Sequence, residues 1–325
     1  MSENSKIEWT DHTFNGWEGC QKVGPGCDHC YAETRNARFG SGTAVNWGPG
    51  APRRRTSPSN WLKPRRWNDA HDAFFAAHGR RQRVFCSSLA DVFDNAVDQQ
   101  WRWDLFALID RTPNLDWLLL TKRIGNVKQM LHDSGYEKLQ DNVWLGATIV
   151  NQTEADRDIP KLLAVPARVR FLSMEPLLGP VDLRTIDIDG HSEIYPLTGT
   201  TGCTDDDGNP AANMPALDWV IVGGESGPCA RPMHPDWARS LRDQCAAAGV
   251  PFLFKQWGEW CPRGPESMGY TLVDGVPRVR LTDAGENGQQ LGAHGDNDCW
   301  MNRAGKARAG RLLDGCQHDG YPEGA

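Results

Sequence analysis

The sequence predicts an α/β protein built on a parallel sheet, arranged as a partial or closed (β/α)6–8 barrel with polar insertions and an irregular C-terminal tail. Two observations lead to this prediction. Short, nearly continuous apolar runs recur along the chain, as expected for strands buried on both faces of a parallel sheet. Helical patterns lie between these runs, and repeated strand–helix–strand succession gives right-handed crossovers and a parallel sheet.

The expected strands are short apolar runs that each lead into polar or glycine residues. In parallel barrels the residues that follow the strands face the active site, so these positions are the first candidates for functional side chains. The runs are Val84–Cys86, Trp117–Leu120, Val143–Thr148, Val169–Leu172, Trp219–Val222 and Pro251–Phe254, and Ile7–Thr10 is a possible first strand.

Two of the intervening helices have clear sequence signals. One covers residues 97–111 and stops before Pro113. The other covers residues 235–248, opens with Pro235 and stops at Gly249, which are common helix start and stop residues. Cys245 falls on the apolar face of this second helix, so we expect it to be a buried structural residue.

The expected domain organisation is one barrel over residues 1–260 and a C-terminal extension over residues 261–325 that packs on it. Two stretches interrupt the strand–helix rhythm, an insertion rich in Gly, Pro, Arg and Trp at residues 40–68 and a polar, glycine-rich excursion at residues 184–216. The extension is rich in glycine and charge, and its sequence predicts no regular fold.

Composition favours an intracellular enzyme. The chain has 325 residues, a net charge of −7 and ten cysteines. It contains no apolar run that could span a membrane and no N-terminal export signal, so we expect a cytoplasmic protein without a membrane partner. In a reducing compartment cysteines are more often metal ligands or buried residues than bridges. The acidic charge argues against a general nucleic-acid coat protein but leaves room for a local basic surface.

The most informative motif is a glycine-rich loop with three cysteines, Cys20, Cys27 and Cys30, in the spacing C-x6-C-x2-C. Three thiolates are one too few for a closed structural zinc site, but they suit an iron–sulfur cluster that keeps one iron open for a ligand. A zinc site remains the alternative, with a fourth ligand from His12, His29 or a later cysteine. A disulfide framework is the least expected arrangement.

Basic residues interleaved with tryptophans follow the cysteine loop. Arginines clamp phosphates and aromatic rings stack on bases, so this mixture predicts a nucleic-acid or nucleotide substrate. The alternative is a solvated loop that its tryptophans pin to the barrel. The expected substrate-binding residues are Arg53, Arg54, Arg55, Lys63, Arg65 and Arg66, with Trp47, Trp61 and Trp67 between them and Lys122, Arg123, Lys255 and Gln256 at strand ends.

Several motifs in a fixed order together resemble a known family. They are the cysteine loop, Ser87-Ser88-x-x-Asp91, Leu120–Arg123, Glu175–Pro180, Gly223–Gly227 and Lys255–Gly258. The chain resembles the phage-associated three-cysteine-motif family, which is similar to radical S-adenosylmethionine (SAM) enzymes and most nearly to the spore photoproduct lyase branch. The resemblance runs from about Lys6 to Gly258 and returns at Gly305–Gly315. The first cysteine gap is longer than in the usual radical SAM spacing.

The resemblance implies a barrel of radical-SAM type, a [4Fe–4S] cluster on Cys20, Cys27 and Cys30, and SAM bound to the open iron. An external electron donor would reduce the cluster, and cleavage of SAM would give a 5′-deoxyadenosyl radical that takes hydrogen from the substrate. Tyr31 would pack beside the cluster. SAM would be bound through Ser87, Ser88 and Asp91 at its aminoacyl end and Thr148 and Asn151 at its ribose, with Glu175, Gly223, Gly224 and Glu225 near the adenine or the substrate.

The resemblance also implies a substrate. Occurrence in phages and similarity to a DNA-lesion repair enzyme point to modification or isomerisation of a thymine-derived base or nucleotide in phage DNA, inside the bacterial host. Two other functions stay open at this point. One is a zinc-stabilised nucleic-acid-binding protein, and the other is a radical SAM enzyme that acts on a peptide or a small molecule.

Overall fold

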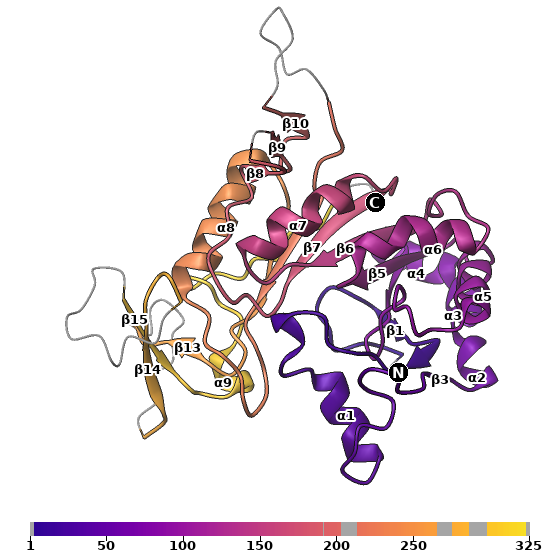
Figure 1. Ribbon diagram of the computed structural model, residues 1–325, viewed down its shortest axis with the longest axis horizontal. Helices are drawn as coiled ribbons and strands as arrows, with labels where there is room; N and C mark the ends of the chain where they lie inside the picture. The colour runs from indigo at the N-terminus through magenta and orange to yellow at the C-terminus, as the bar shows by residue number, and fades with distance from the viewer. Residues whose placement is uncertain (1–2, 191, 203–212, 265–274, 286–297, 323–325) are drawn as a thin grey trace, which may run out of the picture. The chain divides into compact units, whose positions relative to one another are not determined.

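The computed structural model describes residues 3–190, 192–202, 213–264, 275–285 and 298–322. The chain divides into two compact units (Figure 1). The first unit comprises residues 1–147 and 164–170, and the second comprises residues 148–163 and 171–325. The predicted boundary at residue 260 is a different division, and it stays a prediction.

A seven-stranded parallel sheet gives the protein its mixed α/β architecture. Its strand order is β1-β4-β5-β6-β7-β11-β12, and every ladder that the structure describes between neighbours is parallel. This order has two ends, β1 and β12, which is compatible with a partial barrel. The strands are β1 (His12–Phe14), β4 (Gln82–Cys86), β5 (Leu115–Thr121), β6 (Val143–Thr148), β7 (Val169–Met174), β11 (Trp219–Gly223) and β12 (Phe252–Gln256).

The sequence located most of these strands because their burial is almost continuous. In β6 all six residues are buried, and in β11 all five are. Such runs are typical of parallel strands covered on both faces. The expected first strand at Ile7–Thr10 was wrong, since β1 begins at His12. Thr10 lies just before β1, and its hydroxyl donates to the carbonyl of His12 at 2.8 Å.

Most helices of the first unit are short. Among them, α3 lies against β5 and α4 against β4. The predicted helix at residues 97–111 is confirmed as α5, which the Asp98 side chain caps by accepting a bond from the Gln100 amide at 2.8 Å. The helices are α1 (Tyr31–Phe39), α2 (Pro58–Trp61), α3 (Lys63–Asp69), α4 (His71–His78), α5 (Gln99–Asp110) and α6 (Val127–Asp133), with 3₁₀ turns at Pro25–Cys27 and Ile124–Asn126.

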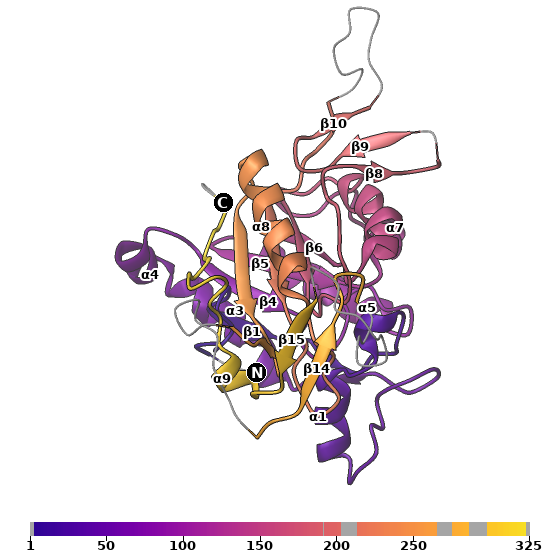
Figure 2. The ribbon, with the colours of Figure 1, turned by 90° about the vertical axis from the view of Figure 1, so that its left-hand side faces the viewer.

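In the second unit, α8 (Pro235–Ala248) packs along β11 and β12 (Figure 2). The structure confirms its predicted bounds, and Gly249 ends it with φ +70°, a conformation that glycine adopts without strain. Cys245 is fully buried on this helix, and burial raises the pKa of its thiol to about 12. The other helices of this unit are α7 (Gln152–Leu163) and α9 (Lys306–Ala309).

The remaining elements that the structure describes are short strands. The expected excursion at residues 184–216 contains β8 (Ile186–Asp187), β9 (Glu193–Tyr195) and β10 (Thr200–Thr201), and the part at residues 203–212 lies outside the described residues. The expected extension contains β13 (Cys261–Pro262), β14 (Arg278–Leu281) and β15 (Cys299–Asn302). Near the C-terminus, Asp319 pairs with Leu253 of β12, so this segment runs along the last strand of the sheet. In the first unit, β2 (Trp17–Glu18) pairs with β3 (Arg54–Arg55).

Candidate functional site

The cysteine loop follows β1 and β2, next to the carboxyl end of β4. Gly19 bridges to Ala90, and its amide donates to the carbonyl of Leu89 at 3.1 Å. Gly19 has φ +113°, and a Cβ there would lie 2.6 Å from the carbonyl oxygen of Asn46, so only glycine fits this crossing. The loop is therefore held against the segment that follows β4.

The three cysteines occupy different local structures within the loop. Cys20 pairs with Trp47, Cys27 ends the 3₁₀ turn at Pro25–Cys27 and is buried, and Cys30 immediately precedes α1. All three are free thiols. Within the described residues, no three His, Cys, Asp or Glu side chains form a group that could hold a metal ion. The three sulfurs are thus on one short loop without forming a preassembled metal site.

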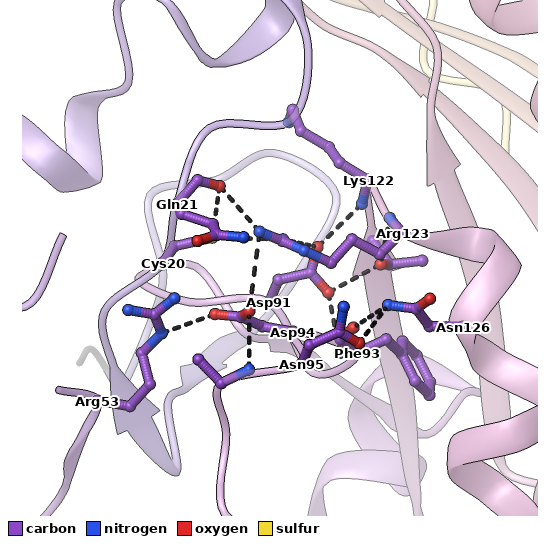
Figure 3. A network of polar contacts seen from close by, with 12 residues as sticks. Cys20, Gln21, Arg53, Asp91, Phe93, Asp94, Asn95, Lys122, Arg123 and Asn126 are labelled. Atoms are coloured by element: carbon purple, nitrogen blue, oxygen red, sulfur yellow. Dashed lines mark hydrogen bonds and ion pairs between the residues drawn. The ribbon is translucent and has the colours of Figure 1, made fainter. Parts of the chain in front are cut away.

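Arg123, just beyond β5, contacts the first of these cysteines (Figure 3). Its Nη1 lies 3.4 Å from the Cys20 Sγ, and its Nη2 donates to the carbonyl of Gln21 at 2.8 Å. Burial raises the pKa of the Cys20 thiol to about 11, and the Arg123 charge opposes that rise. Burial also disfavours the charged guanidinium, but Asp91, Cys20 and Asp94 together keep the pKa of Arg123 above its ordinary value.

Asp91 is the main anchor of Arg123. Its Oδ2 accepts from Arg123 Nη1 at 3.0 Å and from the Lys122 amide at 3.1 Å. Its Oδ1 accepts from the Thr121 hydroxyl at 2.8 Å and from the Phe93 amide at 2.9 Å. Protein donors thus fill all four usual acceptor positions of this carboxylate. Its contact with SAM stays a prediction.

A second buried pair lies beside this one. Arg53 Nε donates to Asp94 Oδ2 at 2.7 Å, and the two side chains are 1% and 0% exposed. Asp94 Oδ1 also lies 3.9 Å from Arg123 Nη2. The Cδ of Arg53 packs where a side chain on Gly19 would lie, so Arg53 lies next to the cysteine loop. Its Nη2 is buried without a hydrogen-bond partner among the described residues.

The predicted serines lie at the carboxyl end of β4. Ser87 is buried beside Cys86, with 3.2 Å between their side-chain oxygen and sulfur. Ser88 accepts a hydrogen bond at its hydroxyl from Asn15 at 3.0 Å, and the Tyr31 hydroxyl donates to its carbonyl. Tyr31 therefore links the first residue of α1, directly after Cys30, to the β4 segment.

Some of the remaining basic residues of the insertion form ion pairs within the protein, and others are exposed. Arg54 pairs with Glu18, and Arg55 pairs with Asp104 at 2.5 Å while its guanidinium lies 4.6 Å from the ring centre of Trp61. Trp67 is buried and stacks on His12 at 4.1 Å. Lys63 is half-buried, whereas Arg65 and Arg66 are exposed.

The second unit holds another polar cluster at the carboxyl ends of its strands. Glu175 follows β7, and its two carboxylate oxygens accept from Lys255 Nζ at 2.6 Å and from Gln256 Nε2 at 2.8 Å, both on β12. Gln256 also donates to the Ser226 hydroxyl at 3.2 Å, and its Oε1 is buried without a hydrogen-bond partner in the described part of the chain. The cluster therefore retains a spare acceptor.

Three glycines beside this cluster, Gly223, Gly224 and Gly258, allow close packing of the protein. A Cβ on Gly224 would lie 2.0 Å from the carbonyl oxygen of Trp257, and one on Gly258 would lie 2.1 Å from that of Glu225. A Cβ on Gly223 would contact the Glu175 side chain at 3.3 Å. Protein backbone and the Glu175 side chain therefore fill the space beside these glycines.

The other residues predicted to bind SAM are also engaged by the protein. The carboxylate of Glu225 accepts from the Arg231 side chain at 2.7 and 2.9 Å. Asn151 Oδ1 accepts from the Glu154 amide at 2.9 Å in the first turn of α7, as a helix cap does. Thr148, the last residue of β6, is buried. Their roles toward SAM stay predictions.

Sequence reasoning missed Asn15 and Asp94. Asn15 is fully buried and joins the loop after β1 to that after β4, because its Oδ1 accepts from the Leu89 amide at 2.7 Å. The spacing Asp91-x-x-Asp94 after a strand was the available signal for Asp94. For Asn15 no local signal existed, since the partners of its side chain, Ser88 and Leu89, lie more than seventy residues away.

Comparison with known proteins identifies a family without an assigned activity. No curated protein and no solved structure matches the chain significantly. No helix in the described ranges is both long and apolar enough to cross a membrane. A family model described as "Protein of unknown function (DUF5131)" matches residues 4–322, nearly the whole sequence, so the chain belongs to this family.

Proposed function

We propose that this protein is a radical SAM enzyme whose [4Fe–4S] cluster is held by Cys20, Cys27 and Cys30, and that it modifies or isomerises a thymine-derived base or nucleotide of phage DNA. The observation that supports it best is the placement of three free thiols on one loop after the first strand of a parallel sheet. Three thiolates leave one iron of such a cluster open for SAM.

The donor set and its surroundings fit this cluster. The loop spans eleven residues from Cys20 to Cys30, and Arg123 already lies 3.4 Å from one sulfur. Arg53 also lies next to the loop, and its buried Nη2 has no hydrogen-bond acceptor among the described residues. A sulfide or thiolate would supply one. Binding requires the loop to bring its sulfurs together, because the described residues contain no preformed three-ligand group.

When bound, the reduced cluster and SAM supply a carbon radical able to remove a hydrogen atom from the substrate. The chain supplies binding and orientation. Ser87 and Ser88 lie after β4, next to the segment to which the cysteine loop is bonded, and are the proposed contacts for the aminoacyl end of SAM. In the second unit Glu175 is bonded to Lys255 and Gln256, and the roles of these three residues toward SAM or substrate stay predictions.

The nucleic-acid part of the proposal depends on exposed cations of the insertion. Arg65 and Arg66 are exposed and can face a phosphate, and Arg54 has a side chain that is 63% exposed. Arg53 is buried with Asp94, so we assign it to supporting the cysteine loop. Trp67 is likewise buried, which leaves Trp47 and Trp61, both half-buried, as the aromatic residues for stacking.

Metal analysis of the full-length protein purified without oxygen tests this proposal. We expect about four irons and four sulfides per chain, with the visible absorbance of an iron–sulfur protein. Stoichiometric zinc without iron would instead support a zinc-stabilised nucleic-acid-binding protein. A full cluster without any DNA or nucleotide substrate would favour a peptide or small-molecule substrate.

A further inference from the structure

Arg123 contacts a buried carboxylate, the sulfur of Cys20 and the backbone of the cysteine loop. One guanidinium nitrogen, Nη1, lies 3.4 Å from the sulfur of Cys20 and 3.0 Å from Asp91 Oδ2, and the other, Nη2, lies 2.8 Å from the carbonyl of Gln21. The side chain is 7% exposed. Arg123 thus links the end of β5 to the sulfur and to the backbone of the cysteine loop.

Two buried carboxylates restrict where this guanidinium can lie. Asp91 accepts four hydrogen bonds from the protein, so its own position is fixed. Asp94 is fully buried between the two arginines. Its Oδ1 lies 3.9 Å from Arg123 Nη2, and its Oδ2 lies 2.7 Å from Arg53 Nε. The two arginines and two aspartates carry no net charge together, so the guanidinium can stay buried without an uncompensated charge.

A cation held at this sulfur has a clear physical effect. A thiolate is the form that binds metal, and burial disfavours it. An N–H donor and a positive charge beside the sulfur offset that cost, and they stabilise the more negative, reduced state of a cluster. Hydrogen bonds to cluster sulfurs are among the features that set reduction potentials, and supporting contacts around metal ligands affect metal affinity.

We propose that Arg123 is a positioning residue for the metal centre, which donates to the Cys20 sulfur when that sulfur is a ligand, and that Asp91 and Asp94 act through it. The inference rests on the proposed function only in that Cys20 binds a metal. Asp91 then serves the site as a support for Arg123, because its acceptor positions are already filled by protein donors.

Cobalt(II) titration of the metal-free full-length protein under anaerobic conditions tests this inference independently of radical chemistry. Sulfur-to-cobalt charge-transfer absorbance reports thiolate binding. Arg123→Gln should bind cobalt about 10- to 100-fold more weakly than the wild type, with a shifted charge-transfer band. Lys128→Gln, a matched loss of one exposed cation on α6, should bind as the wild type does.

A double-mutant cycle locates the effect at Cys20. In a Cys20→Ala background the Arg123→Gln change should weaken cobalt binding by a smaller factor than in the wild type, because the side chain at position 20 then has no atom that can accept a hydrogen bond from Arg123. The same factor in both backgrounds would show that Arg123 acts elsewhere and would overturn the inference. In the reconstituted protein the midpoint potential of the cluster should shift to more negative values in Arg123→Gln.

Arg123→Lys covers the case in which Arg123→Gln does not fold. Lysine keeps the charge near Asp91 but cannot reach Cys20, Asp91 and Gln21 together in the geometry of a planar guanidinium. A folded Arg123→Lys protein should show a shifted charge-transfer band and weaker cobalt binding. A wild-type band and affinity in this variant would contradict the inference. If the wild type binds cobalt but never assembles an iron–sulfur cluster, the proposed function fails while the role of Arg123 stands.

Discussion

Both units hold ion pairs that involve residues at the carboxyl ends of their parallel strands, but the exposure of these charges differs. In the first unit Arg53, Arg123, Asp91 and Asp94 have side chains no more than 7% exposed and are bonded mostly to one another and to backbone. In the second unit the ion pair of Glu175 and Lys255 keeps 21% and 15% of its side chains exposed. A buried, mutually satisfied network is suited to holding a fixed centre, whereas a partly open pair can exchange partners with a ligand.

The largest expected effect is on metal content, which should depend on the loop cysteines of the first unit and not on Cys245 of the second. Cys27→Ser should remove the iron–sulfur absorbance and most of the iron, because a cluster with only two protein ligands is poorly held. Cys245→Ala should retain both, since this thiol is buried on α8. Iron and sulfide assays of both variants check this. Full iron content in Cys27→Ser would show that the loop is not the ligand set.

The next effect concerns stability. Arg53→Gln leaves the buried Asp94 with only the more distant Arg123, at 3.9 Å, as an ion-pair partner, which should lower the free energy of unfolding by about 3 kcal/mol. Lys255→Gln should cost about 1 kcal/mol or less, because Glu175 keeps solvent access and its bond from Gln256. Chemical denaturation of the full-length variants compares the two. Equal losses would mean that the two networks are not as different as their burial indicates.

A smaller effect is expected on nucleic-acid binding. Replacing the exposed Arg65 and Arg66 by Gln should reduce the slope of log affinity against log salt by about 0.7 to 0.9 for each phosphate that the variant no longer binds. Fluorescence anisotropy with a labelled DNA strand at several salt concentrations measures the slope, with Lys128→Gln as the control. An unchanged slope would show that these arginines are only a solvated surface.

The smallest expected effects are pH dependences of opposite sign in the two units. Burial raises the pKa of Asp116 above its ordinary 3.8. The hydrogen bond from Arg184 lowers the pKa of Asp182 below the same 3.8. The folded state therefore binds the Asp116 proton more tightly than the unfolded chain does, and releases the Asp182 proton more readily.

These shifts determine two pH windows. Ionisation of Asp116 lowers the stability of the fold as the pH rises from 3.8 through the raised folded pKa. The stability of Asp116→Asn should therefore increase relative to that of the wild type across that window. Ionised Asp182 stabilises the fold above pH 3.8, and this contribution is lost as the pH falls through the lowered folded pKa. The stability of Asp182→Asn should therefore decrease relative to that of the wild type as the pH rises through the same range. Urea midpoints at a series of pH values measure both. Parallel curves for the two variants would contradict the assignment.

Much of the fold was predictable because it depends on local apolar pattern. The runs in β4, β5, β6, β7, β11 and β12 are buried nearly throughout, and α8 carries both a start and a stop signal. The first strand was misplaced because Ile7–Thr10 is apolar and β-branched at its ends, whereas β1 is the polar-containing triplet His12–Phe14. Its pairing with β4 lies about seventy residues away and leaves no local trace.

The site was predictable in its residue types and less so in its partners. The sequence singled out Asp91, Arg123, Glu175, Lys255 and Gln256, and the structure joins them within their own units. It could not show that Arg53 is buried with Asp94, because an arginine in a run of three looks like a surface charge. It also could not show that Gly224 makes room for the backbone of residue 257, since that contact is set by packing between two distant turns.

The most direct test of the central claim is product analysis after an anaerobic reaction. The reconstituted full-length protein is incubated with SAM and dithionite, and the nucleosides and amino acids are separated by chromatography. We expect 5′-deoxyadenosine and methionine from the wild type and neither from Cys27→Ser. Adenosylhomocysteine as the sole product, or intact SAM in the presence of a complete cluster, would contradict the radical SAM account.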